Sequence, residues 1–226
     1  MTPGMPTNLR NAGTVLRPEP PSLSQRRAWW RKTLHNWHWV SAALCLIGMI
    51  AFAVTGITLN HASQIPALPV VTTQTATLPS DLLTSLIDGP VAGESRPLPA
   101  SIAAWLSTTL GVTVATRSAE WSADEVYVAL PRPGGDGWMS IQRSDGRIEL
   151  EQTDRGWIAY FNDLHKGRNT GNWWNWFIDI FALTCLLFCI TGLLLLHLHA
   201  RNRRTTWPIV GLGLVIPLVV ALLFIH

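Results

Sequence analysis

Three long apolar segments alternate with more polar stretches along the chain. They run from Trp39 to Leu59, from Ile180 to Leu196 and from Pro208 to Ile225, and none of them contains a charged residue. Each approaches the ~20 apolar residues that a helix needs to cross a bilayer core about 30 Å thick. The pattern therefore predicts a membrane protein with three transmembrane helices.

The polar stretch between the first two segments has the patterning of a small folded domain. Residues 80–88 and 98–110 have helical spacing, and the strand-like segments are 112–116, 126–130, 138–142 and 147–150. Ser144-Asp145-Gly146 predicts a hairpin turn. Residues 66–79, rich in Pro and Thr, predict an extended connector. We expect an α+β domain with an antiparallel sheet, and its sequence has no recognisable catalytic triad, metal cluster or nucleotide loop.

The predicted organisation places this domain between the first two spans. It consists of a disordered cytoplasmic tail at 1–28, transmembrane helix 1 at 29–61, the α+β domain at 62–172, transmembrane helix 2 at 173–199, a loop at 200–206 and transmembrane helix 3 at 207–226.

Composition supports the membrane assignment. Only 14% of residues are charged, against about 25% in an ordinary soluble domain. Most of the 12 tryptophans flank the apolar segments, and tryptophan favours the membrane interface. The three cysteines, Cys45, Cys185 and Cys189, all lie inside the apolar segments. They therefore predict no disulfide framework for the α+β domain.

Basic residues are concentrated in two short segments. Residues 1–38 carry six basic side chains and one acid, and the loop 200–206 carries three basic side chains and no acid. The segment 62–172 has a net charge of −4. Lys and Arg beside short loops favour the cytoplasm, so we expect the N-terminus inside, and residues 62–172 and the C-terminus outside. The cluster 26–32 is interpreted as a topology signal and lipid anchor rather than a nucleic-acid site.

The seven histidines lie near the ends of the spans. Thr55 to His61 and Thr191 to His197 both read Thr-Gly-x4-His, on helices that run in opposite directions. His38 precedes the first span and His165 the second. His38 and His61 are 23 residues apart, which corresponds to ~35 Å of helix, so one cofactor cannot contact both. Two sites are predicted, one formed by His38 with His197 or His199 and the other by His61 with His165 or His226.

Haem b is the leading candidate for these sites. Imidazole is an ordinary axial ligand of haem iron, and the porphyrin favours an apolar slot between helices. There is no Cys-x-x-Cys-His, so two non-covalent haems are predicted. Zinc or copper at His35 with His38, or at His197 with His199, is an alternative, although both pairs lack the usual thiol or carboxylate companions. The other alternative is that the histidines only line the membrane interface.

Several stretches carry a resemblance to a known family. They are Trp37-His38-Trp39, Thr55 to His61, Leu164 to Arg168 with Asp179 in the following span, Thr191-Gly192, and TWPIVGLGLVIP at 206–217. On these the chain resembles the PepSY-associated transmembrane family of bacterial inner-membrane proteins over residues 29–226. The resemblance implies a PepSY-like module at 62–172 and a haem protein that moves electrons, some relatives being ferric-siderophore reductases. It also matches His38, His61 and His165 to recurrent histidines of the family.

The sequence thus predicts a di-haem b electron-transfer protein of the inner membrane, with possible oxidoreductase activity. Its electron donor would be quinol or a partner redox protein, because the chain has no flavin or nicotinamide motif. The acceptor would be periplasmic, with ferric iron or a ferric siderophore the first candidate. The competing hypotheses are a cofactor-free anchor whose PepSY-like domain binds or regulates a periplasmic protein, and a small subunit of a larger complex. Membrane lipids are the other expected partners.

Overall fold

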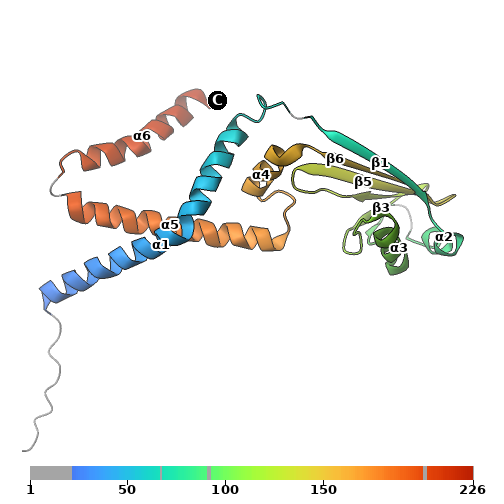
Figure 1. The fold of residues 1–226 in the computed structure, drawn as a ribbon, viewed down its shortest axis with the longest axis horizontal. Helices are drawn as coiled ribbons and strands as arrows, with labels where there is room; N and C mark the ends of the chain where they lie inside the picture. Colours follow the sequence, from blue (N-terminus) through green and yellow to red (C-terminus); the bar gives the residue numbers. More distant parts are fainter. Residues whose placement is uncertain (1–21, 67, 91–92, 201–202, 226) are drawn as a thin grey trace, which may run out of the picture. The chain divides into compact units, whose positions relative to one another are not determined.

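The computed structural model describes residues 22–66, 68–90, 93–200 and 203–225. Three of its helices are long and apolar enough to cross a membrane: α1 (Leu23–Asn60), α5 (Asn172–His199) and α6 (Thr206–Phe224) (Figure 1). In the most apolar 18-residue stretch of each helix, very few residues are buried by other parts of the protein. A lipid environment accounts for such surfaces, because water would not tolerate apolar faces of this extent. The prediction of three apolar helices is confirmed.

The chain forms two compact units. One consists of Met1–Ser41 together with Leu187–His226, and the other of Ala42–Leu186. The first unit contains the beginning of α1, the end of α5 and all of α6. The second contains the rest of α1, a sheet domain and the beginning of α5. We describe each unit separately.

The sheet domain contains six antiparallel strands in the order β1-β6-β5-β4-β3-β2. The strands are β1 (Val70–Thr77), β2 (Ser95–Arg96), β3 (Ala119–Trp121), β4 (Glu125–Ala129), β5 (Gly135–Gln142) and β6 (Arg147–Asp154). The turn between β5 and β6 passes through Gly146 at φ +71°, where only glycine is free of steric strain. This turn sets the register that pairs Ile141 with Ile148.

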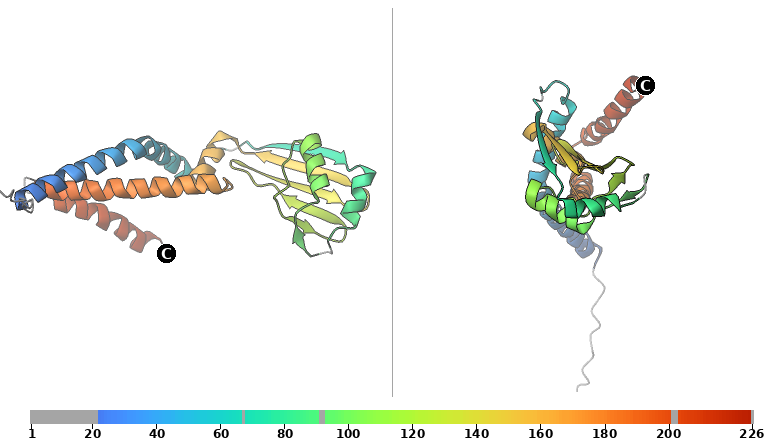
Figure 2. Two further views of the ribbon diagram at one scale, coloured as in Figure 1. Left: turned by 90° about the horizontal axis from the view of Figure 1, so that it is seen from below. Right: turned by 90° about the vertical axis from the view of Figure 1, so that its right-hand side faces the viewer.

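Two helices cover one face of this sheet, as Figure 2 shows. They are α2 (Ser80–Ile87) and α3 (Ala100–Leu110). Leu86, Ile102 and Leu106 of these helices are fully buried against alternate strand residues such as Ile141 and Leu150. Alternate residues of the strands and the inward-facing residues of α3 therefore pack together in one core.

The sequence predicted this domain in part. The predicted helices correspond to α2 and α3, and three predicted strands to β4, β5 and β6. The strand predicted at 112–116 is wrong, because these residues pair with no strand and only pass beside the core, where Val112 and Val114 are buried. The connector predicted at 66–79 contains β1, which pairs along its whole length with β6.

The ends of the long helices differ slightly from the predicted segments. Helix α1 begins at Leu23, inside the segment expected to be a disordered tail. Residues 1–21 of that tail lie outside the described residues. A further helix, α4 (Gly156–Lys166), follows β6 and was not predicted. It is this helix that carries His165.

Candidate functional site

His165 packs into a notch on α1, within the unit 42–186. Its Nδ1 lies 2.6 Å from the hydroxyl oxygen of Thr55. Its ring lies 4.8 Å, centroid to centroid, from the ring of Phe52. Gly56 borders the ring on one side, and a Cβ atom there would lie 3.7 Å from Cε1 of the imidazole, which is an ordinary van der Waals distance. The half-buried imidazole is thus held by one hydroxyl and one aromatic ring.

Helix α4 can hold His165 in this position because two nearby residues of the same helix are also fixed. The Thr58 hydroxyl of α1 donates a hydrogen bond to Oδ1 of Asn162 at 2.7 Å. On the sheet side, the Gly134 amide donates to Oδ2 of the buried Asp163 at 2.9 Å. Helix α4 is therefore bonded both to a membrane helix and to the turn between β4 and β5.

His38 packs into a second notch, on α5, within the other unit. Its Nδ1 lies 3.2 Å from the Thr191 hydroxyl oxygen and 3.3 Å from the carbonyl oxygen of Phe188. Its ring stacks on that of Phe188, with centroids 4.6 Å apart and planes at 14°. A Cβ atom on Gly192 would lie 3.1 Å from Cε1 of His38. The absence of a side chain at Gly192 is therefore what admits the imidazole.

The same residue types in the same order build both notches. Phe52 to Gly56 and Phe188 to Gly192 both read Phe-x2-Thr-Gly. In each notch the phenyl ring lies against the imidazole, the threonine oxygen contacts Nδ1, and the glycine borders the ring, closely at Gly192 and at ordinary contact distance at Gly56. Sequence reasoning found the Thr-Gly-x4-His repeat but missed the phenylalanine three residues before each threonine. The complete repeat is Phe-x2-Thr-Gly-x4-His.

Hydrogen bonding within the notches indicates which ring nitrogen carries the proton. The Thr55 hydroxyl lies 3.0 Å from the carbonyl oxygen of Ala51, and the Thr191 hydroxyl 2.7 Å from that of Leu187. A hydroxyl that donates to this carbonyl presents a lone pair to the imidazole. In that arrangement the imidazole donates from Nδ1, and its neutral form has the free lone pair on Nε2. Neither Nε2 has a hydrogen-bond partner among the residues that the structure describes.

Two other predicted ligands bond to their own helices. Nδ1 of His61 lies 3.0 Å from the carbonyl oxygen of Ile57, and Nδ1 of His199 lies 2.7 Å from that of Leu195. Both imidazoles are exposed. Because their bonding partners are carbonyls, these neutral rings also carry the proton on Nδ1 and leave Nε2 available.

The remaining histidines do not enter a notch. His197 is exposed and lies edge to face against Trp207, with ring centroids 5.7 Å apart. His35 is exposed on α1. His226, predicted as an outer ligand, lies outside the described residues.

The histidine rings of the described residues lie apart from one another. Among the described residues no histidine ring contacts another, and His38 and His165 each contact a threonine of a long helix instead. The described part of the chain also contains no group of three or more His, Cys, Asp or Glu that could hold a metal ion. A haem has a different requirement, because its iron takes at most two axial ligands from the protein.

Comparison with known proteins assigns a family. The model of a family described as PepSY_TM-like matches residues 29–226. The comparison with curated proteins gave no match, and neither did the comparison with solved structures.

Proposed function

The chain belongs to the PepSY_TM-like family, and we propose that it binds haem b through imidazoles of its helices and passes electrons across the membrane. Bound haem supplies one-electron redox chemistry, and two axial imidazoles would leave the iron no open position for oxygen. The role of the chain is to hold and orient the imidazoles and to surround the haem with apolar side chains. The donor chemistry of the two notches fits this group.

The observation that carries the proposal is that a threonine hydroxyl contacts Nδ1 of His38 and of His165, while Nε2 of each ring has no hydrogen-bond partner among the described residues. A metal-binding histidine almost always donates its other N–H to a fixed acceptor, which sets the tautomer and ring orientation. The hydroxyls of Thr55 and Thr191 are such acceptors. The same arrangement occurs twice, once in each compact unit, as two separate haem sites require.

Each site would take a second imidazole from another histidine of the same unit. For the His38 site this would be His197 or His199, and for the His165 site His61. His61 lies six residues after Thr55 on α1, which is ~9 Å along a helix. A haem would fill the space between two such rings, whereas direct contact between them would leave no room for it.

The charge bias supports one orientation of the chain. Basic residues near the start of α1 and in the loop 200–206 favour the cytoplasmic side, which would leave the acidic segment 62–172 in the periplasm of a bacterial inner membrane. In that orientation the residues of the His38 site would hold a haem that accepts electrons from quinol or a partner redox protein. The residues of the His165 site would hold one that passes them to a periplasmic acceptor, for which ferric iron or a ferric siderophore is the first candidate.

The absorbance spectrum of the purified protein tests the proposal. We expect the spectrum of haem b. His38→Ala and His165→Ala should each bind one haem fewer per protein, and the double variant should bind none. His35→Ala is the matched control, because His35 is an exposed histidine of the same helix as His38 and should keep both haems. A colourless protein from haem-sufficient cells would contradict the proposal.

A second candidate function, a cofactor-free anchor that displays a binding domain, is favoured by the sheet face opposite α2 and α3. Tyr127 and Trp138 stack on this face with centroids 6.3 Å apart, and Trp138 donates a hydrogen bond to Glu151 at 3.2 Å. The register adds Glu149 beside them. A photo-crosslinker at exposed Thr75 on this face should then capture a periplasmic protein in intact cells, and one at exposed Thr108 on α3 should not.

A further inference from the structure

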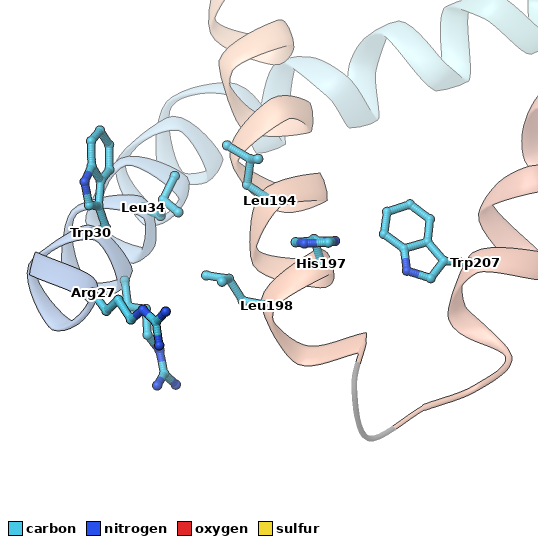
Figure 3. Close-up of a pocket in the computed structure, with 8 residues that line it drawn as sticks. Arg27, Trp30, Leu34, Leu194, His197, Leu198 and Trp207 are labelled. Atoms are coloured by element: carbon cyan, nitrogen blue, oxygen red, sulfur yellow. The ribbon is translucent and has the colours of Figure 1, made fainter. Parts of the chain in front are cut away.

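A groove with apolar walls opens at one end of the first unit, where three helix ends meet. It has a volume of about 910 Å³ and is lined by the beginning of α1, the end of α5 and the beginning of α6. Figure 3 shows Leu34 of α1 opposite Leu194 and Leu198 of α5, with His197 between these and Trp207 of α6. Binding sites for small molecules span roughly 300–1,000 Å³. The groove is therefore large enough for a ligand rather than a single water.

One helix face supplies both the charge and part of the apolar wall. Arg27, Trp30, Arg31 and Leu34 all line the groove. Their spacing of three and four residues places them on the same side of α1. Arg27 and Arg31 lie about two turns and one turn before Leu34, with Trp30 between them. The arginines form the end toward the start of α1, here called the cationic end, and Leu34 with the leucines of α5 forms the apolar body.

The described residues of the first unit include no acidic side chain that could balance this charge. In the first unit, residues 1–41 contain one acid, Glu19, and residues 187–226 contain none. Within the described residues neither Arg27 nor Arg31 has an ion-pair partner; the four ion pairs found all lie in the segment 94–166. The cationic end therefore lacks a counter-charge that an anionic ligand would supply.

The position of the groove along the helices places it at a membrane boundary. Arg27 lies four residues after the start of α1, His197 two residues before the end of α5, and Trp207 one residue after the start of α6. Tryptophan and arginine at the ends of membrane helices sit at the level of the lipid headgroups. The cationic end thus lies where lipid phosphates lie, and the apolar body where acyl chains begin.

We propose that this groove binds one anionic phospholipid. The phosphate lies between Arg27 and Arg31, and the acyl chains lie against Leu34, Leu194 and Leu198. Basic pockets between membrane helices are known to take anionic headgroups. A free phosphate would leave the apolar body unused, and a zwitterionic lipid would bring its own positive charge to the arginines. The groove shares His197 with the proposed haem sites, but none of the lipid contacts proposed here uses that residue.

The experiment measures lipid binding to the full-length protein in detergent. The variant Arg27→Gln with Arg31→Gln removes both groove cations. The matched control, Arg26→Gln with Lys32→Gln, removes the same charge from the same helix at residues that do not line the groove. We expect phosphatidylglycerol to bind the first variant roughly tenfold more weakly than the control, as the loss of a charge-assisted hydrogen bond implies. Phosphatidylcholine and inorganic phosphate should bind neither protein measurably.

A second variant tests the apolar body without changing charge. Leu194→Trp places a larger side chain in the groove, and it should release co-purified phosphatidylglycerol, detected by native mass spectrometry, while the arginines stay in place. Equal weakening of both double variants would overturn the proposal in favour of non-specific surface attraction. So would retention of lipid by Leu194→Trp. Repeating the measurement on protein from haem-deficient cells separates the two proposals, because lipid binding should be unchanged there even if haem binding fails.

Discussion

At the scale of single residues, the two imidazole notches differ in one respect. His38 has two acceptors for its Nδ1 proton, the Thr191 hydroxyl and the carbonyl of Phe188. His165 has one, the Thr55 hydroxyl. An unsatisfied donor in an apolar surrounding costs more than a weakened hydrogen bond. The two threonines should therefore contribute unequally to stability, although they occupy equivalent positions of the repeat.

Replacement of each threonine by valine measures this difference, because valine keeps the shape and removes the hydroxyl. We expect Thr55→Val to lower the free energy of unfolding by about 1 kcal/mol, in the range of hydrogen bonds between membrane helices. Thr191→Val should lower the free energy of unfolding by less than half as much. Denaturant unfolding in detergent provides the measurement, with Thr55→Ser and Thr191→Ser as controls that restore the hydroxyl. An equal loss for the two valine variants would show that the Phe188 carbonyl does not act as a second acceptor.

At the scale of elements, helix α4 depends on a close approach to the turn between β4 and β5. Gly134 in this turn has φ +70°, and a Cβ atom there would lie 2.7 Å from Cα and 2.8 Å from N of Tyr160 in α4. The obstruction is backbone, so it cannot rotate away. The same turn is bonded to Asp163 of α4, and displacement of the helix would therefore break that bond as well.

Alanine at Gly134 should accordingly destabilise the sheet domain more than alanine at another left-handed glycine. Gly111 is the matched control, because it has φ +67° and its Cβ would meet nothing within 4 Å. We expect Gly111→Ala to cost about 1–2 kcal/mol from the backbone conformation alone. Gly134→Ala should cost about 1–3 kcal/mol more from overpacking. Thermal unfolding followed by far-UV circular dichroism checks both values. Similar losses of stability in the two variants would show that α4 moves away from a Cβ at residue 134 with little loss of free energy.

The elements that sequence patterning missed have physical reasons in common. Strand β1 is an edge strand whose residues are nearly all exposed, so it shows no alternation of apolar and polar positions. Residues 112–116 alternate because Val112 and Val114 enter the core, but burial alone does not create strand pairing. Helix α4 has exposed aromatic residues such as Trp157, which obscure its amphipathic pattern. Local patterning reports burial, whereas pairing depends on distant partners.

The candidate site was predictable to a similar extent. The repeat that ends in His61 and His197 is visible in the sequence, and it correctly directed attention to the Thr-Gly segments. The sequence could not reveal that the threonine of each repeat receives an imidazole from a different helix. Which imidazole reaches which threonine depends on how far the helices are shifted along one another. Packing of the phenylalanine rings and glycines against the imidazoles sets that shift. Histidine spacing indicates which rings lie near the same helix ends, whereas helix packing forms the notches that receive His38 and His165.

At the scale of the whole molecule, the charge pattern predicts an orientation that both proposals use. The net charge of −4 in residues 62–172 contrasts with the basic segments at 1–38 and 200–206. If the acidic segment faces the periplasm, the groove arginines face the cytoplasmic leaflet. The His165 site then lies on the side where a periplasmic acceptor is available. A reversed orientation would exchange these assignments.

Cysteine labelling in intact cells tests this orientation in a variant whose three native cysteines are replaced by alanine. A membrane-impermeant maleimide should label Thr109→Cys on α3 in intact cells, because that exposed residue belongs to the sheet domain. Ser24→Cys at the start of α1 should be labelled only after lysis. Phe224→Cys at the end of α6 should be labelled like Thr109→Cys if α6 crosses the membrane. Labelling of Ser24→Cys before lysis would show that the chain has the opposite orientation. Protection of Phe224→Cys would show that α6 does not span the bilayer.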